Sequence, residues 1–153
     1  MRKKIESAIK DSILTKEEIL KSQADNIEKA ALTIIDSIKK GGKLFIFGNG
    51  GSADDSQHIA AELVGRFKAE RKPLAAIALT TDTSALTAIA NDYGYDIVFS
   101  RQIEALASGG DVALGISTSG NSKNVIEAFK KAKALGLTRI ALSGGDGGRM
   151  KNE

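Results

Sequence analysis

Apolar residues recur with a helical period in the first quarter of this chain and cluster into short runs after it. Up to about residue 40 they return every three or four positions, as on one face of a helix. Ile5, Ile9 and Ile13 begin this stripe, Asp25 is the predicted N-cap that divides it into two helices, and Gly41 and Gly42 end the second. Residues 1–40 are therefore predicted to be helical. The isoleucine-rich first helix packs either against another subunit or against its own domain, and both interpretations stay open.

From Lys43 onward, short apolar runs alternate with amphipathic segments. Such alternation is typical of a parallel sheet that is covered by helices on both faces. The predicted strands are residues 44–47, 74–79, 112–116 and 139–142, and the predicted helices are 53–68, 83–90, 96–107 and 123–135. We therefore expect one domain over residues 1–153, with N-terminal helices over 1–40 and a three-layer α/β/α sandwich with a parallel, flavodoxin-like sheet over 43–153.

Composition narrows the classes of function. The apolar fraction of 42% and the charged fraction of 27% are ordinary for a globular protein. The absence of cysteine excludes disulfides and thiolate metal sites. A net charge of +3 with 5% aromatic residues lacks the basic face and stacking side chains of a nucleic-acid binder, and the basic stretch 66–72 is interpreted as a solvated helix end. No leader or membrane-length apolar run is visible, so we expect a cytoplasmic protein that binds neither nucleic acid nor membrane.

Two polar, glycine-containing turns follow predicted strands and precede predicted helices. The first comprises Gly48, Asn49, Gly50, Gly51 and Ser52; the second comprises Ser117, Thr118, Ser119, Gly120, Asn121 and Ser122. A turn at a helix N-terminus binds anions, because its free N–H groups and the helix dipole both attract negative charge. Ordinary N-capping would explain one hydroxyl of the second turn but not four. Since ligands of parallel sheets bind at the carboxyl ends of strands, these turns predict a phosphorylated small molecule there.

His58 and Glu62 lie four residues apart on the predicted helix 53–68, so their side chains can meet one ligand. An imidazole and a carboxylate at this spacing suit a zinc-type ion, or a carboxylate base held by the histidine. The alternative is a surface pair that stabilises the helix. The position of the pair, soon after the first turn, favours a metal-binding or catalytic role over a surface pair.

Other signals are weaker. Gly48, Gly50 and Ala53 fit a variant of the dinucleotide fingerprint, but the nearest acidic residue after the next strand, Asp82, lies 30 residues beyond Ser52. No P-loop sequence and no nucleophile-elbow serine are present. The turn that contains Asn91 and Asp92 is an ordinary turn signal, and it could also reach a sugar hydroxyl or a neighbouring subunit.

Taken together, these motifs resemble the sugar isomerase (SIS) domain family and, within it, the phosphoheptose isomerases. The matching blocks are GNGGS at 48–52, QHIAAEL at 57–63, GRF at 65–67, TTDTSALTAIANDYGYDIVFSRQ at 80–102 and GDVALGISTSGNSKNV at 110–125. Several blocks in register are far more specific than any one of them.

The resemblance implies a role for each matching residue. The substrate contacts it implies are Asn49, Gly50, Gly51, Ser52, Glu62, Asn91, Asp92, Ser117, Thr118, Ser119 and Ser122. It implies that His58 and Glu62 are ligands of one zinc ion per subunit, and that Glu62 is also the catalytic base. Members of the family continue with a further strand and helix, which supply the remaining zinc ligands and are absent from this chain.

The activity implied by the resemblance is aldose–ketose isomerisation. It would convert sedoheptulose 7-phosphate into glycero-manno-heptose 7-phosphate through an enediol, the first step of nucleotide-activated heptose biosynthesis, as for lipopolysaccharide. The resemblance also implies a homotetramer. The alternative is a non-catalytic SIS protein that binds a sugar phosphate or a protein partner, of the type that associates with the DnaA initiator; Glu62 favours the enzyme, because mere binding does not require a carboxylate there.

Overall fold

The computed structural model describes residues 1–153, which form two compact units, Met1–Thr33 and Ile34–Glu153. Helix α1 (Arg2–Ser22) and most of helix α2 (Ala24–Lys39) make up the first unit, and the end of α2 belongs to the second. None of the helices combines the length and the apolar character needed to cross a membrane.

The break between α1 and α2 comes earlier than predicted. Gln23 ends α1 with φ −122° while its N–H still bonds the Ile19 carbonyl, and α2 begins at Ala24. Asp25 is therefore not the N-cap; it lies in the first turn of α2, where its charge still complements the positive end of the helix dipole.

The second unit is built on a parallel sheet in the strand order β2-β1-β3-β4, with bounds Leu44–Gly48 for β1, Ala76–Ala78 for β2, Val112–Ser117 for β3 and Thr138–Ser143 for β4. This confirms the predicted fold class. In the register of the two central strands, Gly48 of β1 lies opposite Ile116 of β3. The loops that follow these two strands therefore leave the sheet side by side.

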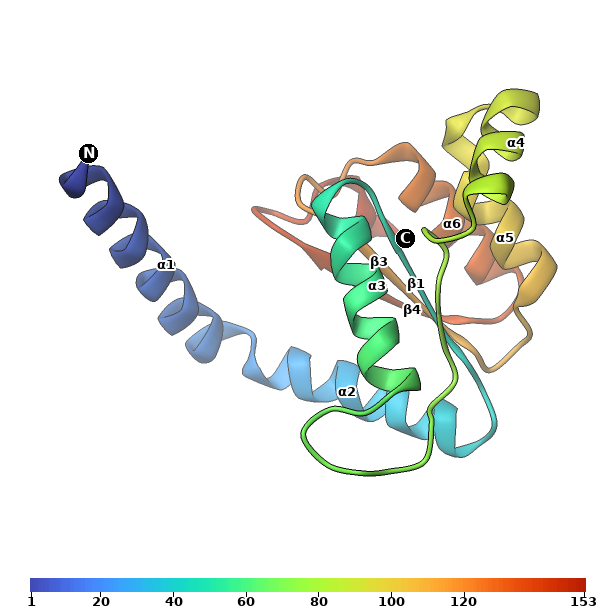
Figure 1. Cartoon of the computed structure of the whole chain (residues 1–153), viewed down its shortest axis with the longest axis horizontal. Helices are drawn as coiled ribbons and strands as arrows, with labels where there is room; N and C mark the ends of the chain where they lie inside the picture. Colours follow the sequence, from blue (N-terminus) through green and yellow to red (C-terminus); the bar gives the residue numbers. More distant parts are fainter. The chain divides into compact units, whose positions relative to one another are not determined.

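Helices cover both faces of the sheet, because the side chains of its central strands alternate (Figure 1). Phe45 and Phe47 join the larger core cluster with helices α4 (Thr83–Tyr93), α5 (Val98–Leu106) and α6 (Lys123–Ala134). Leu44 and Ile46 join a second cluster with helix α3 (Gly51–Val64) on the opposite face. The expected three-layer arrangement is thus confirmed.

Some boundaries differ from the sequence prediction. Helix α3 stops at Val64 instead of residue 68 because Gly65 leaves helical geometry, and Phe67, inside the predicted helix, is 57% exposed in the loop that follows. Strand β2 covers only Ala76–Ala78 of the predicted 74–79, the residues that pair with Leu44–Ile46 of β1. A 3₁₀ turn, η1 (Tyr95–Ile97), precedes α5, and another, η2 (Gly148–Asn152), follows β4.

Candidate functional site at the carboxyl ends of the central strands

The first polar turn joins β1 directly to α3. A side chain at Gly48 would bring its Cβ within 2.7 Å of the Ser52 Cβ and 2.8 Å of the Ile116 carbonyl oxygen, so only glycine fits there. Gly50 has φ +56°, a conformation that glycine adopts freely, and it is the N-cap of α3. The Ser52 N–H bonds the Asn49 carbonyl at 3.0 Å, which closes the turn. These residues make a tight corner with the α3 N-terminus at its rim.

The second polar turn joins β3 to α6. The Ser117 side chain is buried, and its hydroxyl oxygen lies 2.9 Å from that of Ser122. Thr118 and Ser119 are exposed. Ser122 is the N-cap of α6, yet its hydroxyl makes no capping hydrogen bond. The first N–H groups of α6 are thus left without a side-chain cap, which is the arrangement that an incoming anion can complete.

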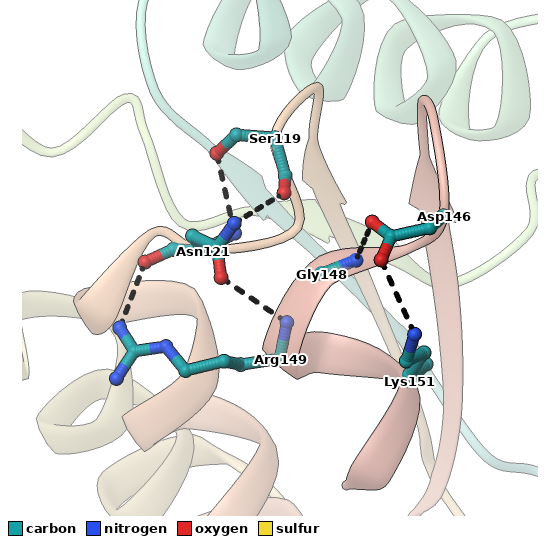
Figure 2. Close-up of polar contacts among 6 residues, drawn as sticks. All are labelled: Ser119, Asn121, Asp146, Gly148, Arg149 and Lys151. Atoms are coloured by element: carbon teal, nitrogen blue, oxygen red, sulfur yellow. Dashed lines mark hydrogen bonds and ion pairs between the residues drawn. The ribbon is translucent and has the colours of Figure 1, made fainter.

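The chain after β4 packs against the second turn, as Figure 2 shows. The Arg149 backbone N–H donates to the Asn121 side-chain oxygen at 3.2 Å, and the Arg149 guanidinium donates to the Asn121 carbonyl at 3.2 Å. The Met150 N–H bonds the Gly120 carbonyl at 2.9 Å, while the Ser119 hydroxyl accepts the Asn121 N–H at 3.2 Å. These contacts hold the second turn against the segment 144–153 and place the Arg149 guanidinium beside it.

Several charged side chains near the second turn form ion pairs. The Asp146 carboxylate accepts the Gly148 N–H at 3.1 Å and pairs with the Lys151 ammonium at 3.3 Å (Figure 2). The Gly148 N–H first, and the Lys151 charge second, lower the pKa of Asp146 below its ordinary value. Lys123, which follows the second turn in sequence, lies 3.7 Å from Asp96 and is likewise paired.

Side chains also connect the two turns. The Asn49 amide of the first turn and the Asn124 amide of α6 exchange two hydrogen bonds, and the Tyr95 hydroxyl donates to Asn49 at 3.3 Å. Sequence reasoning assigned no role to Asn124 or Tyr95. Nothing local marks them, since one is an early helix residue and the other follows a turn.

The His58–Glu62 pair lies apart from the two turns. The His58 Nε2 and Glu62 Oε1 atoms are 3.4 Å apart, and these side chains are 75% and 36% exposed. Glu62 lies ten residues after Ser52, about 15 Å along the axis of α3. No hydrogen bond or ion pair joins either side chain to the turns, so the structure brings together the predicted contacts of the two turns but not the predicted base.

The donor set for zinc is incomplete within this chain. His58 and Glu62 can supply two ligands, but no group of three or more His, Cys, Asp or Glu side chains gathers anywhere in the structure. A zinc site takes three or four protein ligands. The residues of one chain therefore do not by themselves fit a closed zinc site.

Asn91 and Asp92 lie at the exposed end of α4, where the Asn91 amide donates to the Asp92 carboxylate at 2.9 Å. They do not contact either turn, although Tyr95, three residues after Asp92, does. A surface cavity of about 560 Å³ lies between α4 and α5, and none of the predicted site residues lines it. We therefore place the candidate site at the two turns.

The model of the SIS domain matches residues 9–144 of the chain. The parallel sheet, the two anion-type corners and this match agree, and the chain belongs to the SIS-domain family.

Its relatives within that family include phosphoheptose isomerases. The one from Helicobacter pylori strain P12 is 54% identical over 151 residues, which cover 96% of this chain and 79% of the relative. The one from Aquifex aeolicus is 55% identical, covering 98% of this chain and 78% of the relative. The solved structure of the phosphoheptose isomerase from Neisseria gonorrhoeae superposes with a TM-score of 0.94 at 48% identity, over 99% of this chain and 79% of that one. The chain is accordingly a sugar-phosphate isomerase.

Proposed function

We propose that this protein interconverts sedoheptulose 7-phosphate and glycero-manno-heptose 7-phosphate. The observation that carries the proposal is the pairing of two anion-type turns at the ends of the neighbouring strands β1 and β3. The second of these turns leads into α6, whose N-terminus has no side-chain cap. The names of the relatives support the phosphoheptose as substrate.

The second turn would hold the phosphate. Ser117, Thr118, Ser119 and Ser122 supply four hydroxyls in the turn that leads into the uncapped start of α6, and the dipole of this twelve-residue helix favours a dianion there. Arg149 adds a positive charge beside the turn through its contact with Asn121. Phosphate bound in this way would fix one end of the substrate.

The first turn would bind the sugar. The Asn49 amide and the backbone of Gly50, Gly51 and Ser52 offer donors next to the phosphate position, where they can hold hydroxyls of the open-chain form. Asn91 and Asp92 would make a further substrate contact from the end of α4.

Glu62 would transfer the proton. In the direction from ketose to aldose, its carboxylate removes a proton from C1, which gives a C1–C2 enediol, and the proton is returned to C2. The O1 hydroxyl loses its proton to become the aldehyde, and the O2 carbonyl gains one to become the hydroxyl. Because no atom is gained or lost overall, a positioned base and donors for the enediolate suffice.

The position of Glu62 supports sites that are shared between subunits, within the homotetramer that we propose. The Glu62 side chain is partly exposed and lies about 15 Å along α3 from the first turn of its own chain, which is far for a base that must reach C1. A base from a neighbouring copy would remove this difficulty. The exposed isoleucines of α1 offer apolar surface for such an assembly.

Zinc is part of the proposal only as an occupant of the His58–Glu62 pair. Zinc at this position would act as a Lewis acid toward the enediolate oxygens. His58 and Glu62 would be two of its ligands, and any further ligands would have to come from outside this subunit's described residues.

The test is an isomerase assay with sedoheptulose 7-phosphate as substrate. We expect the native protein to be active and the E62Q variant to lose about 10²- to 10⁴-fold in kcat, as for loss of a general base. The matched control is D55N, which removes an exposed carboxylate from the same helix and should leave kcat unchanged. Near-normal turnover by E62Q would contradict the assignment of the base, and an inactive native protein would contradict the proposed substrate.

A further inference from the structure

Two asparagine side chains 75 positions apart in sequence lie face to face between the two turns. The Asn49 Nδ2 donates to the Asn124 Oδ1 at 2.9 Å, and the Asn124 Nδ2 donates to the Asn49 Oδ1 at 2.8 Å. Asn124 is only 4% exposed. A buried amide is unfavourable unless it is hydrogen-bonded, so this reciprocal pair is the arrangement that makes Asn124 tolerable in the interior.

The hydrogen bonds of Asn49 determine what it can offer to a ligand. Its Oδ1 accepts from both Asn124 and the Tyr95 hydroxyl, the latter at 3.3 Å, so both acceptor positions are used. One N–H of its Nδ2 is used by Asn124. The group that remains is the second N–H of Asn49, which can donate to a substrate oxygen.

Asn124 is also tied to the second turn. It is the second residue of α6, and the N-cap of that helix, Ser122, contributes a hydroxyl to the proposed phosphate site. The reciprocal amide pair thus joins the element that would hold the sugar to the element that would hold the phosphate.

We propose that Asn124 is a positioning residue for the isomerase reaction. It holds the Asn49 amide in one orientation, with an N–H directed to the substrate, and it fixes the distance between the two turns. Being buried, Asn124 acts through Asn49 and does not touch the substrate itself. This inference rests on the proposed function, because the reaction is what the positioning serves.

The N124D variant distinguishes a residue that positions the Asn49 amide from one that only stabilises the fold. The introduced carboxylate, when ionised, has only acceptors, so one of its oxygens would face the Asn49 Oδ1 without a proton between them. When protonated, the introduced carboxyl has one donor and one acceptor, like the amide, and would restore both hydrogen bonds. Burial raises the pKa of such a carboxyl, which brings its protonation into an accessible pH range.

We therefore expect the ratio of kcat/KM between N124D and the wild type to depend on pH. The ratio should be about one tenth or less at pH 8 and should recover toward one as the pH falls through the pKa of the introduced carboxyl. The N124L variant, which has no donor or acceptor, should show a reduced ratio at every pH. N26D makes the same chemical change at an exposed position in α2 and should give a ratio near one throughout.

The possible outcomes distinguish the positioning role of Asn124 from the proposed isomerase function. A pH-independent ratio for N124D, whether near one or uniformly low, would overturn the positioning role while leaving the isomerase assignment intact. An inactive wild type would overturn the proposed function, and the affinity for sedoheptulose 7-phosphate measured by calorimetry would then replace kcat/KM. The same pH-dependent ratio in affinity would support the amide pair, and absence of binding by the wild type would overturn both.

Discussion

At the scale of single residues, the His58–Glu62 pair shows what spacing can and cannot specify. Four-residue spacing on a helix places the two side chains next to each other, and they are 3.4 Å apart in the structure. The same spacing says nothing about what else approaches them. No third metal-binding side chain does so within this chain, and both side chains remain partly or largely exposed.

The zinc proposal gives a prediction at this scale. We expect the native protein to retain about one zinc per subunit after dialysis, and the H58A variant to lose it, because a zinc ion needs each of its three or four protein ligands. Metal content measured by plasma mass spectrometry tests this. Q57A, an exposed neighbour on α3, should keep the zinc, and a native protein without zinc would contradict the proposal.

Asn124 and Tyr95 are residues of the site that the sequence pattern alone does not mark. The sequence marks Ser117 to Ser122 as unusual, because four hydroxyls gather within six residues. It does not mark Asn124, since a single asparagine in the first turn of a helix is common. Only the parallel pairing of β1 with β3 brings Asn49 within 3 Å of it.

At the scale of secondary-structure elements, β3 and α6 approach each other closely because Gly115 has no side chain. A Cβ built there would lie 2.6 Å from the Phe129 ring and 2.9 Å from the Val125 side chain. Both of these side chains are fully buried in the larger core cluster. Close packing of this kind places the α6 N-terminus over the end of β3, where the second turn begins.

We expect G115A to lower the free energy of unfolding by about 1–3 kcal/mol, because an added methyl would overfill a packed core. Denaturant unfolding measures this, as a lower midpoint with an unchanged slope. G109A is the matched control, since its Cβ would find its nearest neighbour at 3.6 Å and the position is exposed. Equal stability of the two variants would show that β3 and α6 can separate without loss.

At the scale of the whole molecule, the two units differ in what they bury. Helix α1 has no buried residue, and Ile5, Ile9 and Ile13 are each about half exposed. The α/β unit, by contrast, encloses its apolar side chains in two clusters. The apolar stripe of α1 is thus surface that a homotetramer could cover.

The triple variant I5S/I9S/I13S tests this assembly. We expect light scattering to show a tetramer for the native protein and a smaller species for the variant, because burial of isoleucine would no longer favour association. The control K3S/K4S/K10S changes three exposed residues of the same helix and should remain a tetramer. An unchanged mass for both variants would exclude the α1 stripe as the interface.

The sequence by itself determined the class of fold, the order of strands and helices, and the two polar turns. These features depend on local periodicity and on glycine and hydroxyl residues within a few positions, which a linear pattern contains. The helix boundaries predicted from the sequence were less accurate at Gln23 and Gly65, where the backbone leaves helical geometry earlier than the sequence pattern indicates.

Only the tertiary structure decided which of the marked residues meet. It joined Asn49 to Asn124 and Tyr95, placed Arg149 against the second turn, and left Glu62 about 15 Å along α3 from Ser52. These relations depend on strand pairing and helix packing between segments far apart in the chain. Since such contacts carry no local signature, the residue types at the site were predictable while their geometry was not.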